Sequence, residues 1–189
     1  MIFWHKFLSW LNPPKAKLTF VYRKDWTGYE TKIVGWQIRE LILMDDYSLH
    51  KGKEDIAQLK KINELVNLSV SYESDLIGYK KRDFWETAKQ VQERKKADCD
   101  GYAIYKMWLM REANLPDDKI IGVICADKST EGHMMAGYKY KENDFYCLDN
   151  GYMYKDVIRA SELFGSNNCK GMKPVAWFNL FSSGSLNVR

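Results

Sequence analysis

The order of the hydrophobic patterns along the chain constrains its fold more than any other feature. Residues 55–66 place apolar side chains on one face of a predicted helix, namely Ile56, Leu59, Ile62, Leu65 and Val66. A second helix is predicted from Asp98 to about Ala113, where Asn114-Leu115-Pro116 ends the pattern. Strand patterns follow. Helices first and antiparallel strands afterwards are typical of the α+β class.

The strand patterns lie in the second half of the chain. Residues 120–126 read as a buried strand, and residues 133–140 and 145–149 as a strand pair around a turn. Residues 175–180 read as one more strand, residues 87–93 as a short helical turn, and residues 18–44 fit either class. Pro13-Pro14 ends an N-terminal arm, so we expect an arm at 1–17 and a single domain at 18–189.

Charge and hydropathy exclude several classes of protein. The net charge of +4, from 29 basic and 25 acidic residues, is too small and too evenly spread to indicate nucleic-acid binding. No apolar run approaches the ~20 residues of a membrane span, and no signal peptide is visible, which favours a cytoplasmic protein. The arm carries apolar residues at helical spacing that either contact a membrane or pack on the domain: Trp4, Phe7, Leu8 and Leu11.

The cysteines show no pattern of a zinc site or a disulfide framework. Cys99, Cys125, Cys147 and Cys169 form no Cys-x-x-Cys pair, and the chain has 3 histidines far apart in the sequence. Cys125 and Cys147 lie in apolar strands and are predicted core residues, whereas Cys169 lies in a predicted loop. Cys99 differs because it sits between two acids in a polar segment.

Cys99 lies where the second helix begins. Asp98 is a suitable N-cap, which places the thiol in the first turn, where the helix dipole favours a thiolate. A backbone N–H at this position can also form half of an oxyanion hole. The alternative interpretation is a partly buried thiol beside a cap.

His133 and Asp149 are the matching base and acid. His133 begins a strand and Asp149 ends the next one. An ideal hairpin pairs His133 with Tyr152, three residues from Asp149 or ~10 Å along the strand, so contact between them requires a bulge or a longer turn. The alternative interpretations are a strand-end histidine and an aspartate that starts a turn.

Four segments together resemble the bacterial transglutaminase-like cysteine proteinases, the family of the LapG-like periplasmic proteases. The segments are Asp83-Phe84-Trp85-Glu86-Thr87, Ala97-Asp98-Cys99-Asp100-Gly101-Tyr102-Ala103-Ile104, Gly132-His133-Met134 and Leu148-Asp149-Asn150, with Val66-Asn67 and Asp75 ahead of them. The resemblance covers roughly residues 55–155. It implies a papain/transglutaminase-like fold with the nucleophile at a helix N-terminus, packed on an antiparallel sheet that carries His and Asp. It also implies Cys99 as nucleophile, His133 as general acid/base and Asp149 as the orienting acid.

The resemblance also implies calcium. The family's ligands flank the nucleophile, which here gives Asp98 and Asp100. Independently, two carboxylates beside a thiol raise its pKa, and a cation would cancel that effect. Alternatively, Asp98 is only a cap and Asp100 a dipole partner. The chain departs from the family pattern at Ala88, Ala97 and Gly101, and Gln92 and Trp85 are weak candidates for the second oxyanion donor.

The sequence therefore predicts a thiol-dependent acyl-transfer hydrolase, a cysteine peptidase that cleaves a protein or peptide substrate. Two alternatives stay open at this point. The same triad could serve a transglutaminase or amidase, with an amine in place of water. The chain could also be a non-catalytic interaction module, encoded by a phage or mobile element.

Overall fold

The computed structural model describes residues 18–22, 56–126, 132–165 and 169–188. The predicted arm at 1–17 and most of the ambiguous segment at 18–44 lie outside these residues. The described elements in chain order are β1 (Leu18–Tyr22), α3 (Ile56–Ser69), β2 (Ser71–Tyr72), α4 (Asp75–Gly78), α5 (Ala88–Arg94), β3 (Lys96–Ala97), α6 (Cys99–Glu112), the 3-10 turn η2 (Asp117–Lys119), β4 (Ile120–Ala126), β5 (Gly132–Lys141), β6 (Asp144–Leu148), β7 (Ile158–Arg159), α7 (Ala160–Leu163), β8 (Lys173–Phe178) and β9 (Ser183–Val188).

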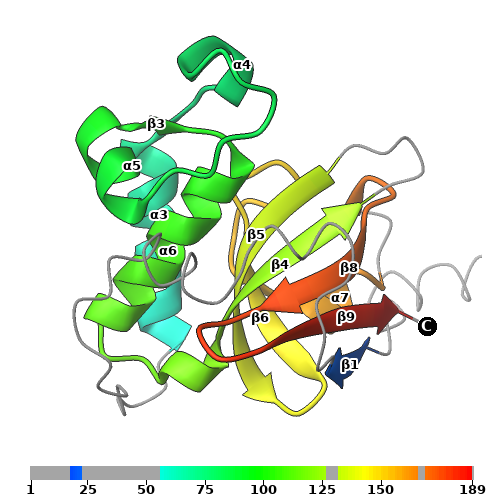
Figure 1. The fold of residues 1–189 in the computed structure, drawn as a ribbon. Coiled ribbons are helices and arrows are strands. Elements are labelled where there is room, and N and C mark those ends of the chain that lie inside the picture. The colour runs from blue at the N-terminus through cyan, green and yellow to red at the C-terminus, as the bar shows by residue number, and fades with distance from the viewer. Residues whose placement is uncertain (1–17, 23–55, 127–131, 166–168, 189) are drawn as a thin grey trace, which may run out of the picture.

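Within the described residues, the main sheet has seven strands in the order β1-β9-β8-β4-β5-β6-β7, and all its pairings are antiparallel. Figure 1 shows α3, α5 and α6 together on one side of this sheet. The short strands β2 and β3 pair in parallel in a separate two-stranded sheet, and β3 ends two residues before the start of α6. The α+β class predicted from the sequence is confirmed.

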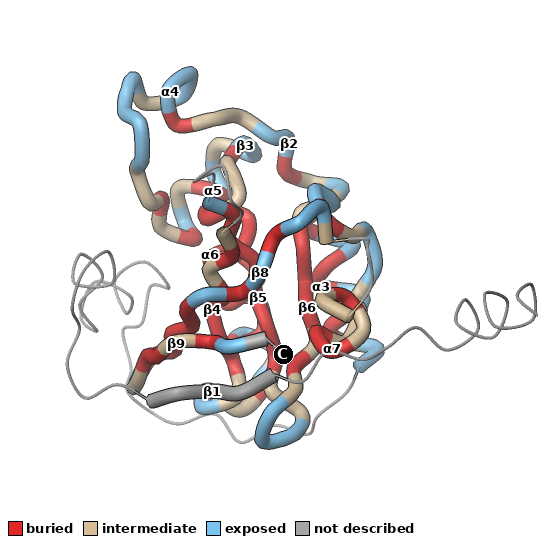
Figure 2. Tube along the Cα trace, turned by 90° about the vertical axis from the view of Figure 1, so that its right-hand side faces the viewer, coloured by how far each residue is buried: buried red, intermediate tan, exposed pale blue. Residues whose placement is uncertain are grey.

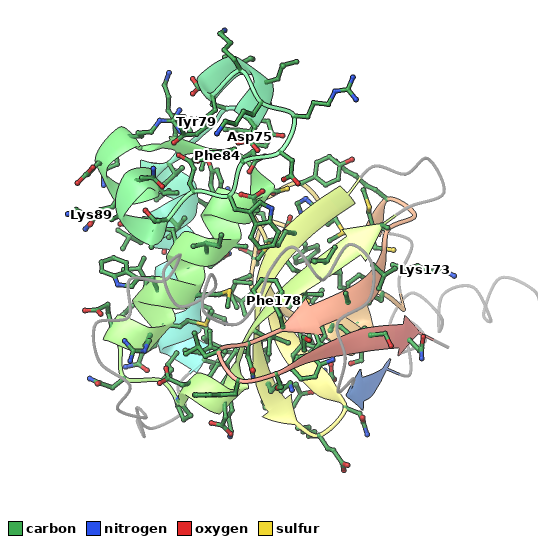
Figure 3. All side chains as sticks on the ribbon, in the orientation of Figure 1. Asp75, Tyr79, Phe84, Lys89, Lys173 and Phe178 are labelled. Atoms are coloured by element: carbon green, nitrogen blue, oxygen red, sulfur yellow. The ribbon has the colours of Figure 1, made fainter. Side chains whose placement is uncertain are left out.

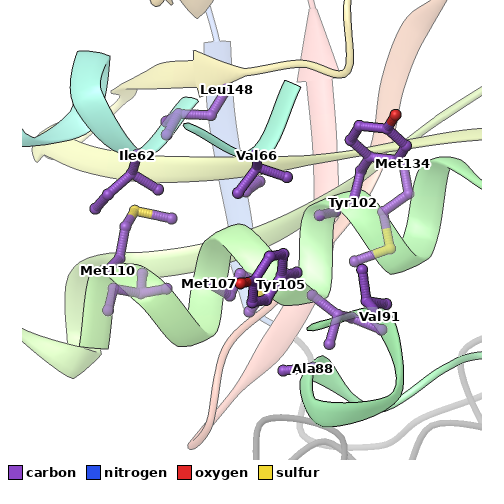
Figure 4. Close-up of a cluster of buried hydrophobic side chains, with 14 of the residues drawn as sticks. Ile62, Val66, Ala88, Val91, Tyr102, Tyr105, Met107, Met110, Met134 and Leu148 are labelled. Carbon is purple, nitrogen blue, oxygen red and sulfur yellow. The ribbon is translucent and has the colours of Figure 1, made fainter. Parts of the chain in front are cut away.

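Helix α6 is the centre of the molecule. It packs on α3 along one side and on β4 and β5 along the other. The close-up in Figure 4 shows the resulting core, in which Met107 and Met110 of α6 lie near Ile62 and Val66 of α3. The burial tube in Figure 2 shows the same buried layer along α6, β5 and β6. A helix that is buried along most of its length is a rigid support for the side chains that project from it.

Helix α3 differs from its prediction in one respect. Leu59, Ile62 and Val66 are buried, but Leu65 is 54% exposed and Ile56 is 42% exposed. The buried stripe instead includes Asn63. An amide is stable there because both ends of it are hydrogen-bonded: Oδ1 accepts from Lys106 and Nδ2 donates to the carbonyl of Lys155.

The other predicted elements are confirmed, with small shifts. A capping box between Thr87 and Gln90 begins α5, and strand β4 spans residues 120–126 as expected. Strand β6 ends at Leu148, so that Asp149 is the first residue after the strand. Strand β8 begins two residues before the predicted Val175.

The described cysteines are all free, and Cys125 and Cys147 are buried strand residues as predicted. Among the described helices, none has both the length and the apolar character needed to cross a bilayer.

Candidate active site

Cys99 is the first residue of α6. Asp98 caps this helix in extended geometry (φ −91°, ψ −164°), and its side chain accepts a hydrogen bond from the backbone N–H of Asp100. The thiol is partly buried against the core, within hydrogen-bonding reach of the backbone N–H groups of Met134 and Asp100. Cys99 therefore lies beside β5, next to the residue that follows His133.

His133 is the second residue of β5, and its Nε2 lies 2.5 Å from Oδ1 of Asp149. Asp149 is fully buried. Its other oxygen, Oδ2, accepts from the backbone N–H groups of Met153 and Tyr154, at 2.7 Å and 3.2 Å. Burial alone raises the pKa of Asp149, but the hydrogen bond and charge of His133 and the two backbone N–H groups bring that pKa below its ordinary value.

The register between β5 and β6 explains how the two residues meet. Ala136 pairs with Leu148, and the pairing shifts between Lys139 and Lys141, near the turn. This irregularity brings Asp149 within two positions of the residue opposite His133, instead of the three expected from an ideal hairpin. Diagonal neighbours across a sheet are within reach of long side chains, so the contact requires no further distortion.

Cys99 and His133 line one cavity of about 640 Å³. The other lining residues are Tyr72, Gly132, Asn150, Gly151, Tyr152 and Met172. The ring of Tyr152 lies 5.0 Å from the imidazole of His133, between their centroids. The structure thus places Cys99 and His133 on one cavity, and it places Asp149 in contact with the imidazole of His133.

The predicted candidates for a second oxyanion donor do not line this cavity. Gln92 is exposed on α5, and the indole N–H of Trp85 donates to Asp83 while its ring contacts Phe178. Tyr72 does line the cavity. It lies on β2, which pairs with β3, the strand that precedes Cys99. No sequence pattern distinguishes Tyr72 from the other tyrosines, because a two-residue strand has no periodicity.

Three carboxylates meet beside the nucleophile. Asp75, Asp98 and Asp100 each offer an oxygen, and these oxygens lie within 4.8 Å of one another. Asp98 and Asp100 are the two acids predicted from the sequence. Asp75 was not predicted as a ligand, although it lies in the segment that resembles the family. Figure 3 shows Asp75 near Tyr79 and Phe84, and the backbone N–H of Phe84 donates to its Oδ2.

In this cluster, burial and mutual repulsion oppose the ionisation of the carboxyl groups. Burial, and then the charge of Asp98, hold the pKa of Asp100 well above its ordinary range, and burial raises the pKa of Asp75 to about 6. Oδ1 of Asp100 is buried and has no hydrogen-bond partner among the described residues. Buried carboxylates with an unused oxygen are the ligands that Ca²⁺ prefers, so these residues fit a bound calcium ion.

The same charges act on the thiol. Burial, followed by the charges of Asp98 and Asp100, raises the pKa of Cys99 to about 12, and the backbone N–H groups of Met134 and Asp100 oppose the shift. The helix dipole alone predicts a lowered pKa. In this site, burial and the charges of the flanking carboxylates outweigh the effect of the helix dipole on the pKa of Cys99.

Comparisons with known proteins bear on the family and the fold of the chain. The sequence model of one family, bacterial transglutaminase-like cysteine proteinase (BTLCP), matches residues 42–162. Among solved structures, LapG of Legionella pneumophila is similar with a TM-score of 0.58 and 23% identity, over 85% of this chain and 81% of LapG. Its EGTA-treated and calcium-bound forms give the same TM-score and identity. The comparison with curated proteins gave no match.

Proposed function

The chain belongs to the bacterial transglutaminase-like cysteine proteinase family, and we propose that Cys99, His133 and Asp149 form the catalytic triad with which it cleaves a protein substrate. The observation that carries this proposal is the 2.5 Å contact between Nε2 of His133 and Oδ1 of Asp149, at a cavity that also exposes Cys99. Family membership makes the chain a cysteine peptidase and favours this role over a non-catalytic module.

The contact with Asp149 assigns roles to the two ring nitrogens. Nε2 of His133 is held by the carboxylate, so Nδ1 is the nitrogen that takes the proton of the Cys99 thiol. The thiolate sulfur attacks the peptide carbonyl carbon, and the C–N bond breaks as His133 returns the proton to the departing amine. The resulting thioester is hydrolysed by a water that His133 deprotonates, which releases the acid and restores the thiol.

The negative oxygen formed during attack needs donors. The backbone N–H of Cys99, at the start of α6, supplies one. We assign the other to the hydroxyl of Tyr72, which lines the same cavity. This assignment is supported by the location of Tyr72 on β2, where it pairs with Ala97, two residues before the nucleophile.

We further propose that Asp75, Asp98 and Asp100 hold a calcium ion. The support is their mutual distance, the unused oxygen of Asp100 and the raised pKa of Asp75. Asp98 has the extended cap geometry that lets it share an ion with Asp100. When bound, calcium supplies positive charge that offsets the carboxylates around the thiol.

Labelling with iodoacetamide tests the nucleophile. In calcium-containing buffer near pH 7, Cys99 should be alkylated faster than Cys169, the other partly exposed cysteine, as measured by peptide mass spectrometry. His133→Ala should remove this difference, because the imidazole no longer accepts the proton. Equal rates for Cys99 and Cys169 in the unchanged protein contradict the triad.

A further inference from the structure

A buried lysine lies behind the triad, on the same helix as the nucleophile. Lys106 is fully buried in α6, two helical turns after Cys99. Lysine is almost never fully buried unless its charge is compensated. The catalytic scheme above gives Lys106 no role, so its contacts require an explanation.

The ammonium group of Lys106 has three acceptors. Nζ lies 2.7 Å from Oδ1 of Asn63, 2.6 Å from the carbonyl oxygen of Asp149 and 3.5 Å from that of Leu148. An ammonium has three N–H donors, so the charged form matches this set, whereas a neutral amine has only two. Two of the acceptors belong to the backbone of the proposed orienting acid and its neighbour.

Two asparagines of helix α3 also bind the main chain of the segment that follows β6. Nδ2 of Asn67 donates to the carbonyl of Asp149 at 3.0 Å, and Nδ2 of Asn63 donates to the carbonyl of Lys155 at 2.9 Å. The carbonyl of Asp149 therefore accepts from both Lys106 and Asn67, while its carboxylate is bound by His133, Met153 and Tyr154. Backbone and side chain of Asp149 are both fixed.

We propose that Lys106 is a positioning residue for the reaction: by binding the main chain at Leu148 and Asp149, it holds the Asp149 carboxylate in contact with His133. The inference rests on the proposed triad. It also gives the single helix α6 two tasks, since its first turn carries the nucleophile and its interior supports the acid. Burial lowers the pKa of Lys106 to about 7, while the charge of Asp149 opposes this shift.

The test uses Lys106→Met, which keeps an apolar chain as long as the aliphatic part of lysine and removes the ammonium donors. Lys60→Met, at an exposed position of α3, is the matched control for loss of a lysine. The first readout is the rate at which iodoacetamide alkylates Cys99 at pH 7 with calcium present. We expect about a tenfold lower rate in Lys106→Met and an unchanged rate in Lys60→Met, since small displacements of catalytic groups reduce rates by such factors.

The second readout is independent of the thiol. The chain has 3 histidines, so ¹⁵N-histidine labelling gives a simple spectrum in which the His133 Nε2–H bound to Asp149 appears as a strongly deshielded proton. Lys106→Met should move this signal upfield or broaden it. A folded Lys106→Met protein with the wild-type signal and labelling rate overturns the proposal, even if its stability is lower.

A second variant covers the case in which Lys106→Met does not fold. Asn67→Ala removes the other donor to the Asp149 carbonyl from a partly exposed position and should change both readouts in the same direction, by less. If Lys106→Met is not recovered as a folded protein, the outcome depends on Asn67→Ala. A folded Asn67→Ala protein with the wild-type labelling rate of Cys99 and the wild-type His133 signal then also overturns the proposal. If the unchanged protein shows no selective labelling of Cys99, the triad fails; the His133 signal still decides the role of Lys106 separately.

Discussion

Asp149 lies two positions out of cross-strand register with His133, yet its carboxylate contacts the imidazole at 2.5 Å. The diagonal geometry is stable because the other carboxylate oxygen accepts from the backbone of Met153 and Tyr154. Asp149 therefore has two functions that mutation can separate: it orients His133, and it closes the loop after β6.

Replacement of Asp149 by Ala should affect both functions. The N–H groups of Met153 and Tyr154 lose their acceptor, which costs about 1–3 kcal/mol for each buried group left unsatisfied. Asp149→Asn keeps one side-chain oxygen, so it should destabilise less while still slowing the alkylation of Cys99. Urea unfolding compares the stabilities. Equal losses of stability in the two variants contradict this division of roles.

Substitutions of Cys99, Cys125 and Cys147 should separate into two groups. Cys99→Ala should abolish activity with little loss of stability, because it removes a small, partly buried group. Cys125→Ser and Cys147→Ser should destabilise by about 1–3 kcal/mol, because a hydroxyl is then buried in the core. Thermal unfolding and hydrolysis of p-nitrophenyl acetate measure the two effects. Full activity in Cys99→Ala identifies a different nucleophile.

Calcium should reverse the effect of removing one acid from the cluster. In EGTA, Asp75→Asn should raise the Tm relative to wild type, because it relieves repulsion with Asp98 and Asp100. In excess calcium the same variant should have the lower Tm, because a ligand that binds only the folded state stabilises it less when its affinity falls. Differential scanning fluorimetry measures both. The exposed Asp156→Asn is the control, and a wild-type Tm that is identical in EGTA and calcium contradicts the site.

Tyr72→Phe isolates the oxyanion donor. Acylation by p-nitrophenyl acetate forms a negatively charged intermediate, so loss of the hydroxyl should slow it by about 10²-fold. Alkylation by iodoacetamide forms no such oxyanion and should keep its wild-type rate. Tyr72 is 65% exposed, so the fold should be unaffected. Equal rates of acylation in the two proteins remove Tyr72 from the mechanism.

The buried ammonium of Lys106 predicts a pH dependence of stability. Its pKa is about 7 in the folded protein, lowered by burial, and near 10.4 in an unfolded chain. Between these values the unfolded state binds a proton that the folded state has released, so the free energy of unfolding rises with pH. Below pH 7 both states are protonated and the slope disappears. Urea unfolding from pH 6 to 8 should show a steeper rise for wild type and for Lys60→Met than for Lys106→Met.

Local patterns identified the helices α3, α5 and α6 and the central strands, and the spacing of Asp98 and Cys99 predicted the start of α6 correctly. Pairings that are distant in the sequence could not be predicted in this way: β1 pairs with β9, Leu18 opposite Val188, and neither strand has a distinctive pattern. The third acid, Asp75, was missed for the same reason, because only the folded chain brings it to the start of α6. Leu65 is exposed whereas Asn63 is buried and hydrogen-bonded to Lys106, and hydrophobic periodicity does not encode such a pairing.

The enclosure of α6 between α3 and the sheet has a consequence for how the enzyme loses activity. Cys99 and Lys106 project from one rod of 14 residues whose interior is buried along most of its length. Fraying of surface segments leaves helix α6 in place. Detachment of α6, in contrast, exposes the main core. Heat inactivation and global unfolding should therefore coincide in a single cooperative transition, with no stable, folded but catalytically dead form between them.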